Sequence, residues 1–169
     1  MANNGDQSTG NVISSSQLLE HWQGHRRLTR KVIEAFPEDK LFSYSVGDMR
    51  PFAMLIQEFL DMAVPGLQGV ITGKWQRAQD MPHFLQTSKP STKAELLGLW
   101  DEATDQLNTL WPTIPAGRFQ EQDKAFGQWD GPVYFFIFYW IDNEIHHRGQ
   151  GTVYLRSLGI EPPAFWDRS

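Results

Sequence analysis

The amino-acid sequence predicts an all-α protein, a four-helix bundle with long connecting loops. Four segments carry apolar residues at the spacing of amphipathic helices, and stretches rich in proline and glycine separate them. No segment alternates convincingly between apolar and polar residues as a half-buried strand would, and no internal repeat occurs. The chain has 169 residues, of which 40% are hydrophobic, which suits one domain with a full core.

The predicted domain follows a polar tail. Residues 1–13 are rich in Asn, Gly, Ser and Thr and contain almost nothing to bury, so we expect them to be disordered. Residues 14–169 then form a single domain, because apolar residues recur over the whole of that range and no linker-like stretch divides it.

The first two helices are bounded by prolines. The first is predicted over residues 14–36, where a run of serines supplies an N-cap and a proline follows the last apolar residue. His21 and His25 lie on or beside its apolar stripe. The second is predicted over residues 51–70, and we expect Pro65-Gly66 to disturb it.

The third helix has the clearest boundaries. It is predicted over residues 92–110, where Thr92 and Glu95 have the spacing of a capping box and leucines follow with nearly heptad regularity. Residues 74–90, before it, lack periodicity and predict a long loop. Residues 112–131, after it, predict a second irregular connector that could include a short extended piece.

The last helix is predicted over residues 132–158, with Gly159 as its C-cap. Its apolar start, residues 133–141, could alone be a buried strand. A helix is favoured because no turn signal separates this run from the helical pattern that follows. Gly149 and Gly151 predict close packing against a neighbouring helix.

Composition excludes several classes of site. The chain has no cysteine, so disulfides and thiolate metal sites are excluded and a metal would need nitrogen or oxygen ligands. The formal charge of −5 argues against binding nucleic-acid phosphates. No apolar run is long enough to cross a membrane and no signal sequence is recognisable. We therefore expect a cytoplasmic protein with no nucleic acid or membrane partner.

Titratable and amide side chains are concentrated near the middle of the last predicted helix. Asn143 and His147 lie four residues apart and therefore share one face, where their polar groups can converge. His146 is turned about 100° away from His147 and is expected at the surface. Glu144 and Arg148 have the spacing of an ordinary stabilising ion pair on a helix.

The same segment carries a family resemblance. The run Ile141-Asp142-Asn143-Glu144-Ile145-His146-His147-Arg148-Gly149-Gln150, followed by Leu155-Arg156 and Leu158-Gly159, resembles the closing helix of DinB-like (DNA-damage-inducible) proteins. Upstream, Phe42-Ser43-Tyr44-Ser45-Val46, Met49-Arg50-Pro51-Phe52 and Gly73-Lys74-Trp75 are similar to the region of that family's second helix. The likeness covers the chain from about Leu18 to its C-terminus.

The resemblance implies a four-helix bundle with a divalent metal held by three histidines, one on the second helix and two on the last. The last-helix pair corresponds to Asn143 and His147 of this chain. The second-helix ligand corresponds to Glu58, with Gln57 as the alternative position. Two of the three expected histidines are therefore replaced. A site of carboxylate, amide and imidazole would suit Zn, Ni, Mn or Fe with lower affinity.

Two interpretations of this polar centre follow. In one, a metal is bound, and His21 or His25 of the first helix supplies a replacement nitrogen. In the other, Glu58 accepts hydrogen bonds from His147 or Arg148 in a buried network without metal.

Each interpretation predicts a different function. With a metal, the resemblance implies a transferase or hydrolase that uses a low-molecular-weight thiol, with Glu58, Asn143 and His147 as ligands. The metal would lower the pKa of a bound water or thiol, and His25 or Tyr154 would transfer protons. Without a metal, we expect a non-catalytic, stress-associated bundle that binds a small ligand or has a structural role as a dimer. A homodimer is expected in either case.

Overall fold

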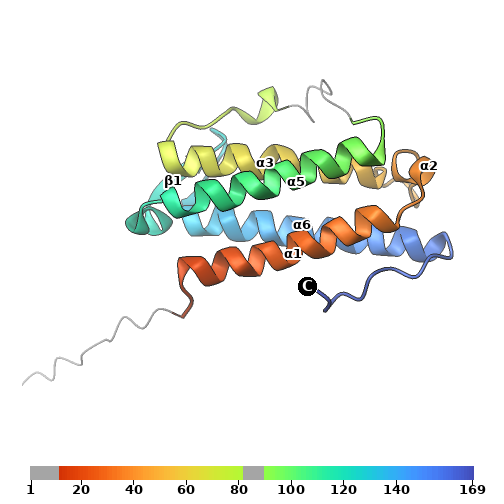
Figure 1. Cartoon of the computed structure of the whole chain (residues 1–169). Coiled ribbons are helices and arrows are strands. Elements are labelled where there is room, and N and C mark those ends of the chain that lie inside the picture. Colours follow the sequence, from red (N-terminus) through yellow and green to blue (C-terminus); the bar gives the residue numbers. More distant parts are fainter. Residues whose placement is uncertain (1–11, 82–89) are drawn as a thin grey trace, which may run out of the picture.

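The computed structural model describes residues 12–81 and 90–169 of the chain and confirms the all-α fold (Figure 1). Its four long helices are α1 (Ser15–Ala35), α3 (Phe52–Thr72), α5 (Lys93–Leu110) and α6 (Val133–Ser157). One-turn elements join them, namely helix α2 (Glu38–Leu41) and 3₁₀ turns at Ala78–Asp80, Trp111–Thr113 and Ala116–Gln120. Residues 1–11 of the predicted 1–13 tail and residues 82–89 of the predicted 74–90 loop lie outside the described residues.

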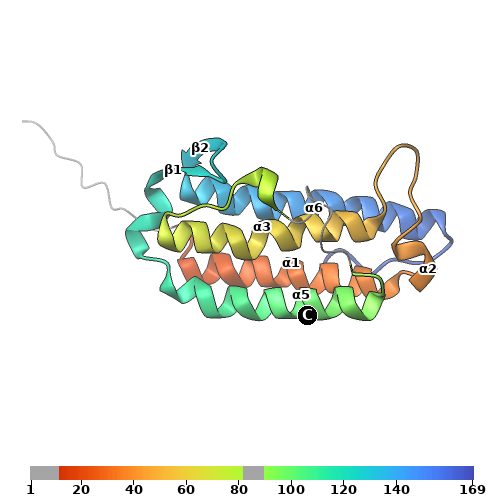
Figure 2. The ribbon, with the colours of Figure 1, turned by 90° about the horizontal axis from the view of Figure 1, so that it is seen from above.

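The bundle has a crossover connection. α1 packs against α5 and α6, and α3 packs against the same two helices. The ribbon shows α1 and α6 running in one direction and α3 and α5 in the other (Figures 1 and 2). Because α3 and α5 are parallel neighbours, the chain between Thr72 and Lys93 has to return along the bundle.

Local signals set the ends of the helices. α1 and α5 each begin with a capping box, formed by Ser14 with Gln17 and by Thr92 with Glu95. α6 ends where Gly159 adopts a φ of 76°, and the N–H of Ile160 donates to the carbonyl of Leu155 over 2.9 Å. The predicted N-caps and the glycine stop are thus confirmed.

Pro65-Gly66, expected to disturb the second helix, does not end it. α3 continues through Pro65, which lies inside the helix and supplies no N–H to it. Ala63 and Leu67, on either side of the proline, are 2% and 0% exposed. Burial of these flanking turns stabilises the helix across the missing hydrogen bond.

A β-hairpin occupies the second predicted connector. Strand β1 (Gln122–Ala125) pairs antiparallel with β2 (Trp129–Pro132), and Ala125 lies opposite Trp129. Both strands contact α6, which follows β2 directly. The expected extended piece is therefore a hairpin, whose four-residue strands are too short to show a strand periodicity in the sequence.

The core has two apolar ends and a polar middle. One cluster lies toward the hairpin and includes Trp22, Leu67, Leu107 and Ile137. The other lies at the opposite end and includes Phe36, Phe59, Leu96 and Leu155. Between the two clusters, α1 and α6 carry buried polar residues, namely Gln23, His25, Arg26, Thr29, Glu144 and Arg148. The candidate site lies beside this polar layer.

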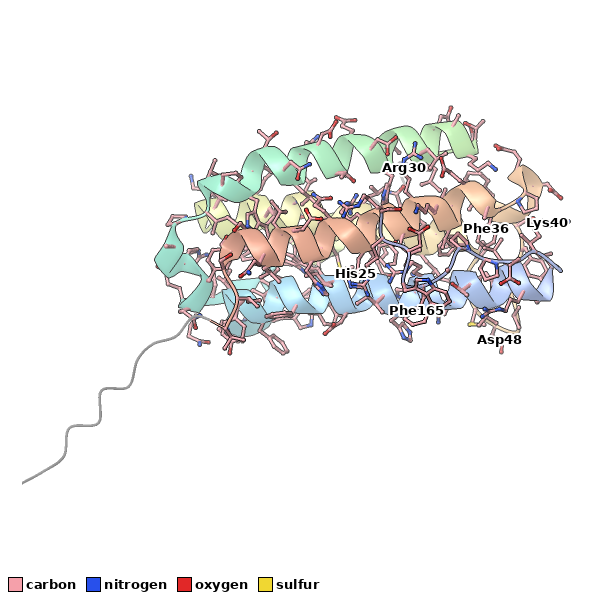
Figure 3. The ribbon with its side chains drawn as sticks, turned by 60° about the horizontal axis from the view of Figure 1, so that its bottom comes forward. His25, Arg30, Phe36, Lys40, Asp48 and Phe165 are labelled. Carbon is pink, nitrogen blue, oxygen red and sulfur yellow. The ribbon has the colours of Figure 1, made fainter. Side chains whose placement is uncertain are left out.

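The C-terminal segment folds back along α1. Lys31 Nζ donates to Asp167 over 2.9 Å, and Arg27 Nε donates to the carbonyl of Arg168 over 2.7 Å. Phe165, on the same segment, lies over the side of the bundle formed by α1 and α6 (Figure 3). This segment therefore covers the edge where those two helices meet.

The two glycines of α6 differ in their surroundings. A Cβ at Gly151 would fall 2.4 Å from a ring carbon of Phe52, which confirms the predicted close packing there. At Gly149, no described atom beyond its own helix lies within 4 Å of that position, so the prediction is wrong for this residue.

Substitution of these two glycines separates packing from helix propensity. We expect Gly151→Ala to lower the free energy of unfolding by about 1 to 3 kcal/mol, because the added methyl overpacks Phe52. Gly149→Ala should raise it by roughly 0.5 to 1 kcal/mol, because alanine favours the helix and the space is open. Urea denaturation of both variants measures the difference, and similar effects at the two positions would contradict the packing.

Candidate functional site

Helix α6 directs two polar pairs toward two different helices. Asn143 and His147 face α3, where both approach the carboxylate of Glu58. Glu144 and Arg148, one residue further round the helix in each case, face α1 and contact its buried side chains. Residues 143–148, identified in the sequence, thus contact both α1 and α3.

The structure brings together the three predicted ligand residues. Asn143 Nδ2 donates to Glu58 Oε1 over 3.3 Å, and His147 Nε2 lies 3.7 Å from the same oxygen. Arg50 Nη2 donates to the other oxygen, Oε2, over 2.7 Å. The second ring nitrogen of His147, Nδ1, is 2.7 Å from Oε1 of Gln150. Glu58 is therefore the centre of a partly buried polar set.

The electrostatic environment keeps Glu58 ionised. Burial raises the pKa of its carboxyl group, but interactions with His147 and Arg50 outweigh burial and lower the pKa to about 2. Gln57, the alternative ligand on α3, instead donates to Asp61 over 3.0 Å.

The donor chemistry of this set does not fit a resident divalent metal. The carboxylate of Glu58 already has a cationic partner in Arg50, and Asn143 directs its N–H group, not its oxygen, at the same centre. One imidazole and one carboxylate remain, fewer than the three protein ligands usual in catalytic zinc sites. Among residues 12–81 and 90–169, no three His, Cys, Asp or Glu side chains are grouped so that they could hold a metal ion.

His25 lies on α1 and contacts α6 rather than Glu58 (Figure 3). Its Nδ1 accepts a hydrogen bond from Arg148 Nη2 over 2.9 Å, and its Nε2 is buried without a partner among the described residues. His21, the other candidate nitrogen, is exposed and packs edge-to-face on the His25 ring. Burial and then the charge of Arg148 lower the pKa of His25 to about 3.

Tyr154, the second candidate for proton transfer, is held in the core. Its hydroxyl donates to the carbonyl of Arg50 over 3.0 Å, and its ring is fully buried against Tyr44. Burial raises the pKa of this hydroxyl. It therefore anchors the backbone of Arg50, the residue that binds Glu58.

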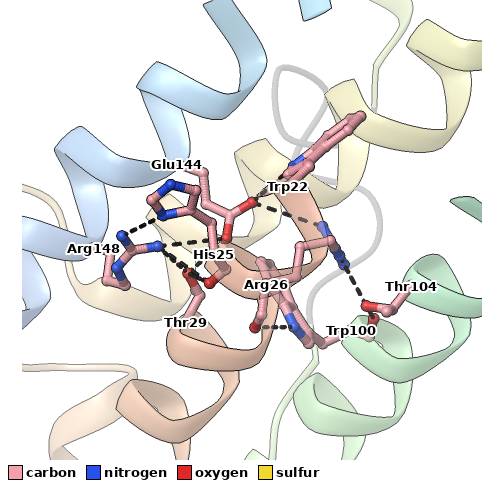
Figure 4. A network of polar contacts seen from close by, with 8 residues as sticks. All are labelled: Trp22, His25, Arg26, Thr29, Trp100, Thr104, Glu144 and Arg148. Atoms are coloured by element: carbon pink, nitrogen blue, oxygen red, sulfur yellow. Dashed lines mark hydrogen bonds and ion pairs between the residues drawn. The ribbon is translucent and has the colours of Figure 1, made fainter. Parts of the chain in front are cut away.

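The buried network around Glu144 was not expected from the sequence (Figure 4). Thr29 Oγ1 and Trp22 Nε1, both on α1, donate to the two carboxylate oxygens over 2.6 and 3.2 Å. The guanidinium groups of Arg148 and Arg26 lie 3.8 and 4.0 Å from them. The predicted pair of Glu144 and Arg148 is present, but it is buried rather than exposed, and each residue also bonds to α1.

Arg26 extends this network to α5. Its Nη2 donates to the carbonyl of Trp100 over 3.1 Å, and its Nε donates to Thr104 over 2.8 Å. The guanidinium carbon also lies 3.9 Å from the centroid of the Trp100 ring, a cation-π contact. Arg26 is thus a core residue, 1% exposed.

An apolar cavity of about 360 Å³ opens next to Glu58. Its wall consists mainly of six aromatic side chains: Phe126, Trp129, Phe135, Phe136, Tyr139 and Trp140. Met62 and Met81 complete much of the rest, and Glu58 alone among the described lining residues carries a charge. Sequence reasoning missed this cavity, although aromatic residues at both buried and exposed positions of 133–141 were a signal for it.

The low pKa of His25 predicts a specific pH dependence of stability. Its folded pKa of about 3 lies below the unfolded value of 6.5, so the unfolded chain takes up a proton first as the pH falls. Between pH 6 and 4, the free energy of unfolding should therefore fall more steeply than in His25→Gln, by up to about 1.4 kcal/mol per pH unit. Exposed His146→Gln is the control and should keep the wild-type slope. Parallel slopes for wild type and His25→Gln would contradict the burial.

Comparisons with known proteins agree with this architecture. The family model of the DinB family matches residues 1–168. A DinB-like protein from Bacillus subtilis superposes with a TM-score of 0.69 at 17% identity, over 90% of this chain and 99% of that one. A DinB-like protein from Bacillus cereus gives a TM-score of 0.65 at 17% identity, over 89% and 97% of the two chains. No curated protein matches. With its family model matched over nearly the whole length, this chain belongs to the DinB family.

Proposed function

We propose that this protein binds a small organic molecule in the aromatic cavity and that Glu58, which Asn143 and His147 contact from α6, orients that ligand. The cavity itself carries this proposal. Its volume of about 360 Å³ falls within the range of small-molecule sites, and its described lining combines an apolar wall with one ionised group, as such sites usually do. Catalysis is not part of the proposal.

The packing of the wall supports a preformed site. The rings of Phe126 and Trp140 meet edge to face with centroids 6.3 Å apart, and Phe126 meets Trp129 in the same way at 6.2 Å. Trp140 also packs on Gly66, where a Cβ would fall 2.6 Å from its ring. Rings held in this way lose little conformational freedom when a ligand enters.

A metal-dependent transferase or hydrolase that uses a thiol is the second candidate. The DinB family is generally associated with metals, and the convergence of Glu58 and His147 favours this function. This function ranks second because Arg50 already binds the carboxylate of Glu58 and only one imidazole, that of His147, is nearby.

The expected homodimer and cytoplasmic location remain predictions. None of the helices in the described part of the chain has the length and apolar character needed to span a membrane. The candidate dimer surface is the outer side of α6, where four aromatic side chains are exposed: Tyr134, Phe135, Phe138 and Tyr139. Since Phe135 and Tyr139 also line the cavity, a second copy bound there would border the ligand site.

Metal analysis of tag-free protein distinguishes the two candidates. After expression with added Zn²⁺, Ni²⁺ or Mn²⁺, we expect a substoichiometric metal content, because only one carboxylate and one imidazole converge. Asn143→His is the positive control, since it restores two imidazoles four residues apart and should increase the bound metal. Stoichiometric metal in the wild type, lost in both Glu58→Ala and His147→Ala, would instead establish the metal-dependent candidate.

Ligand binding is tested by filling the cavity. Titration with tert-butylbenzene should shift the methyl signals of Met62 and Met81, which line the cavity, and leave Met49 and Met54 unchanged in NMR spectra. Ala125→Leu places a larger side chain in the wall and should weaken this binding at least several-fold. Ala116→Leu, the same change at an exposed position, should have no effect. Equal binding by all three proteins would refute the site.

A further inference from the structure

We propose that the ligand of this cavity is an organic cation, an amine or quaternary ammonium group on an apolar or aromatic body. The inference rests on the proposed function, because it requires that the cavity bind a small molecule. The juxtaposition of aromatic rings with a carboxylate oxygen whose hydrogen bond from Asn143 is long, at 3.3 Å, carries it.

The two oxygens of Glu58 are not equivalent. Oε2 accepts a short hydrogen bond from Arg50, at 2.7 Å. In the described part of the chain, the polar partners of Oε1 are Asn143 Nδ2 at 3.3 Å and His147 Nε2 at 3.7 Å. Both distances exceed the roughly 2.7 to 2.9 Å of a charge-assisted hydrogen bond. Oε1 can therefore accept a further, stronger interaction from a cationic ligand.

The aromatic wall complements a positive charge. Ring faces carry negative electrostatic potential and attract ammonium groups, most strongly those of tryptophan, and this wall includes Trp129 and Trp140. The thioethers of Met62 and Met81 add polarizable surface without charge. In the described part of the wall there is no Lys, Arg or His. An anionic ligand would find no cationic partner among these described residues and would be repelled by Glu58.

Solvent screening and the net charge of the chain both favour a cation at Glu58. Arg50 is 43% exposed, so solvent screens its interaction with Glu58 on the outer side, while the carboxylate side chain is 17% exposed. The net charge of −5 on the whole chain also favours the approach of cations over anions.

Three probes of similar shape test the ligand class on the full chain. Phenyltrimethylammonium carries a positive charge, tert-butylbenzene replaces its nitrogen by carbon, and benzenesulfonate carries a negative charge. Dissociation constants come from the methionine methyl signals described above. We expect the cation to bind about tenfold more tightly than the neutral probe, and benzenesulfonate to bind most weakly.

Two variants assign the preference to the residues proposed. Glu58→Gln should weaken binding of phenyltrimethylammonium about tenfold and leave tert-butylbenzene unchanged. Glu102→Gln, which removes a carboxylate from α5, a helix that contributes no residue to the wall, is the matched control and should change neither. Trp129→Leu should weaken the cation more than the neutral probe, because leucine is apolar but has no ring face. Trp129 is 52% exposed, so this variant keeps the test valid if Glu58→Gln does not fold.

The outcomes separate this inference from the proposed function. Equal affinities for the cation and the neutral probe, or tightest binding of benzenesulfonate, would overturn the cationic ligand and leave the cavity as a binding site. A cation preference that survives both Glu58→Gln and Trp129→Leu would also overturn it. Failure of all three probes to bind would count against the proposed function itself.

Discussion

The rest of the structure depends on the buried carboxylate of Glu144. It accepts hydrogen bonds from Trp22 and Thr29, two turns apart on α1, and it faces two guanidinium groups inside the core. A buried charge that loses its partners costs several kcal/mol, so α1 and α6 cannot slide past one another without a large loss of stability. Because Arg26 also binds the carbonyl of Trp100, the same constraint extends to α5. One carboxylate thus sets the register of three helices.

The fixed register of α6 determines where its second polar pair lies. With Glu144 directed at α1, Asn143 is turned toward α3 and reaches Glu58, and His147 follows one turn later. The polar layer also lies between the two apolar clusters, which Met62 on α3 contacts from both sides. At the hairpin end, the rings of α6 meet those of the hairpin and leave the cavity beside Glu58.

Local signals in the sequence predicted the helices, whereas the partners across the bundle could not be predicted. Capping boxes at Ser14 and Thr92 are complete within four residues, so one segment suffices to recognise them. Glu144 lies on the same buried face of α6 as Ile137 and Ile141. A charged residue at this position of an apolar face was a signal for a buried polar network. Its partners on α1 are more than a hundred residues away in sequence, and no periodicity identifies them. The family resemblance predicted Glu58 with Asn143 and His147, but not Arg50, which changes the chemistry of that set.

The turn of the hairpin links this architecture to the proposed ligand site. Phe126 has a φ of 52°, a left-handed conformation that is strained for a bulky residue and costs of order 1 to 3 kcal/mol. Its ring is 3% exposed and contacts Trp75, Trp129 and Trp140, so burial of the ring offsets the strain. A glycine would form the turn without strain but would remove a ring from the cavity wall. The strained phenylalanine is therefore explained better by the wall that it completes than by the turn that it makes.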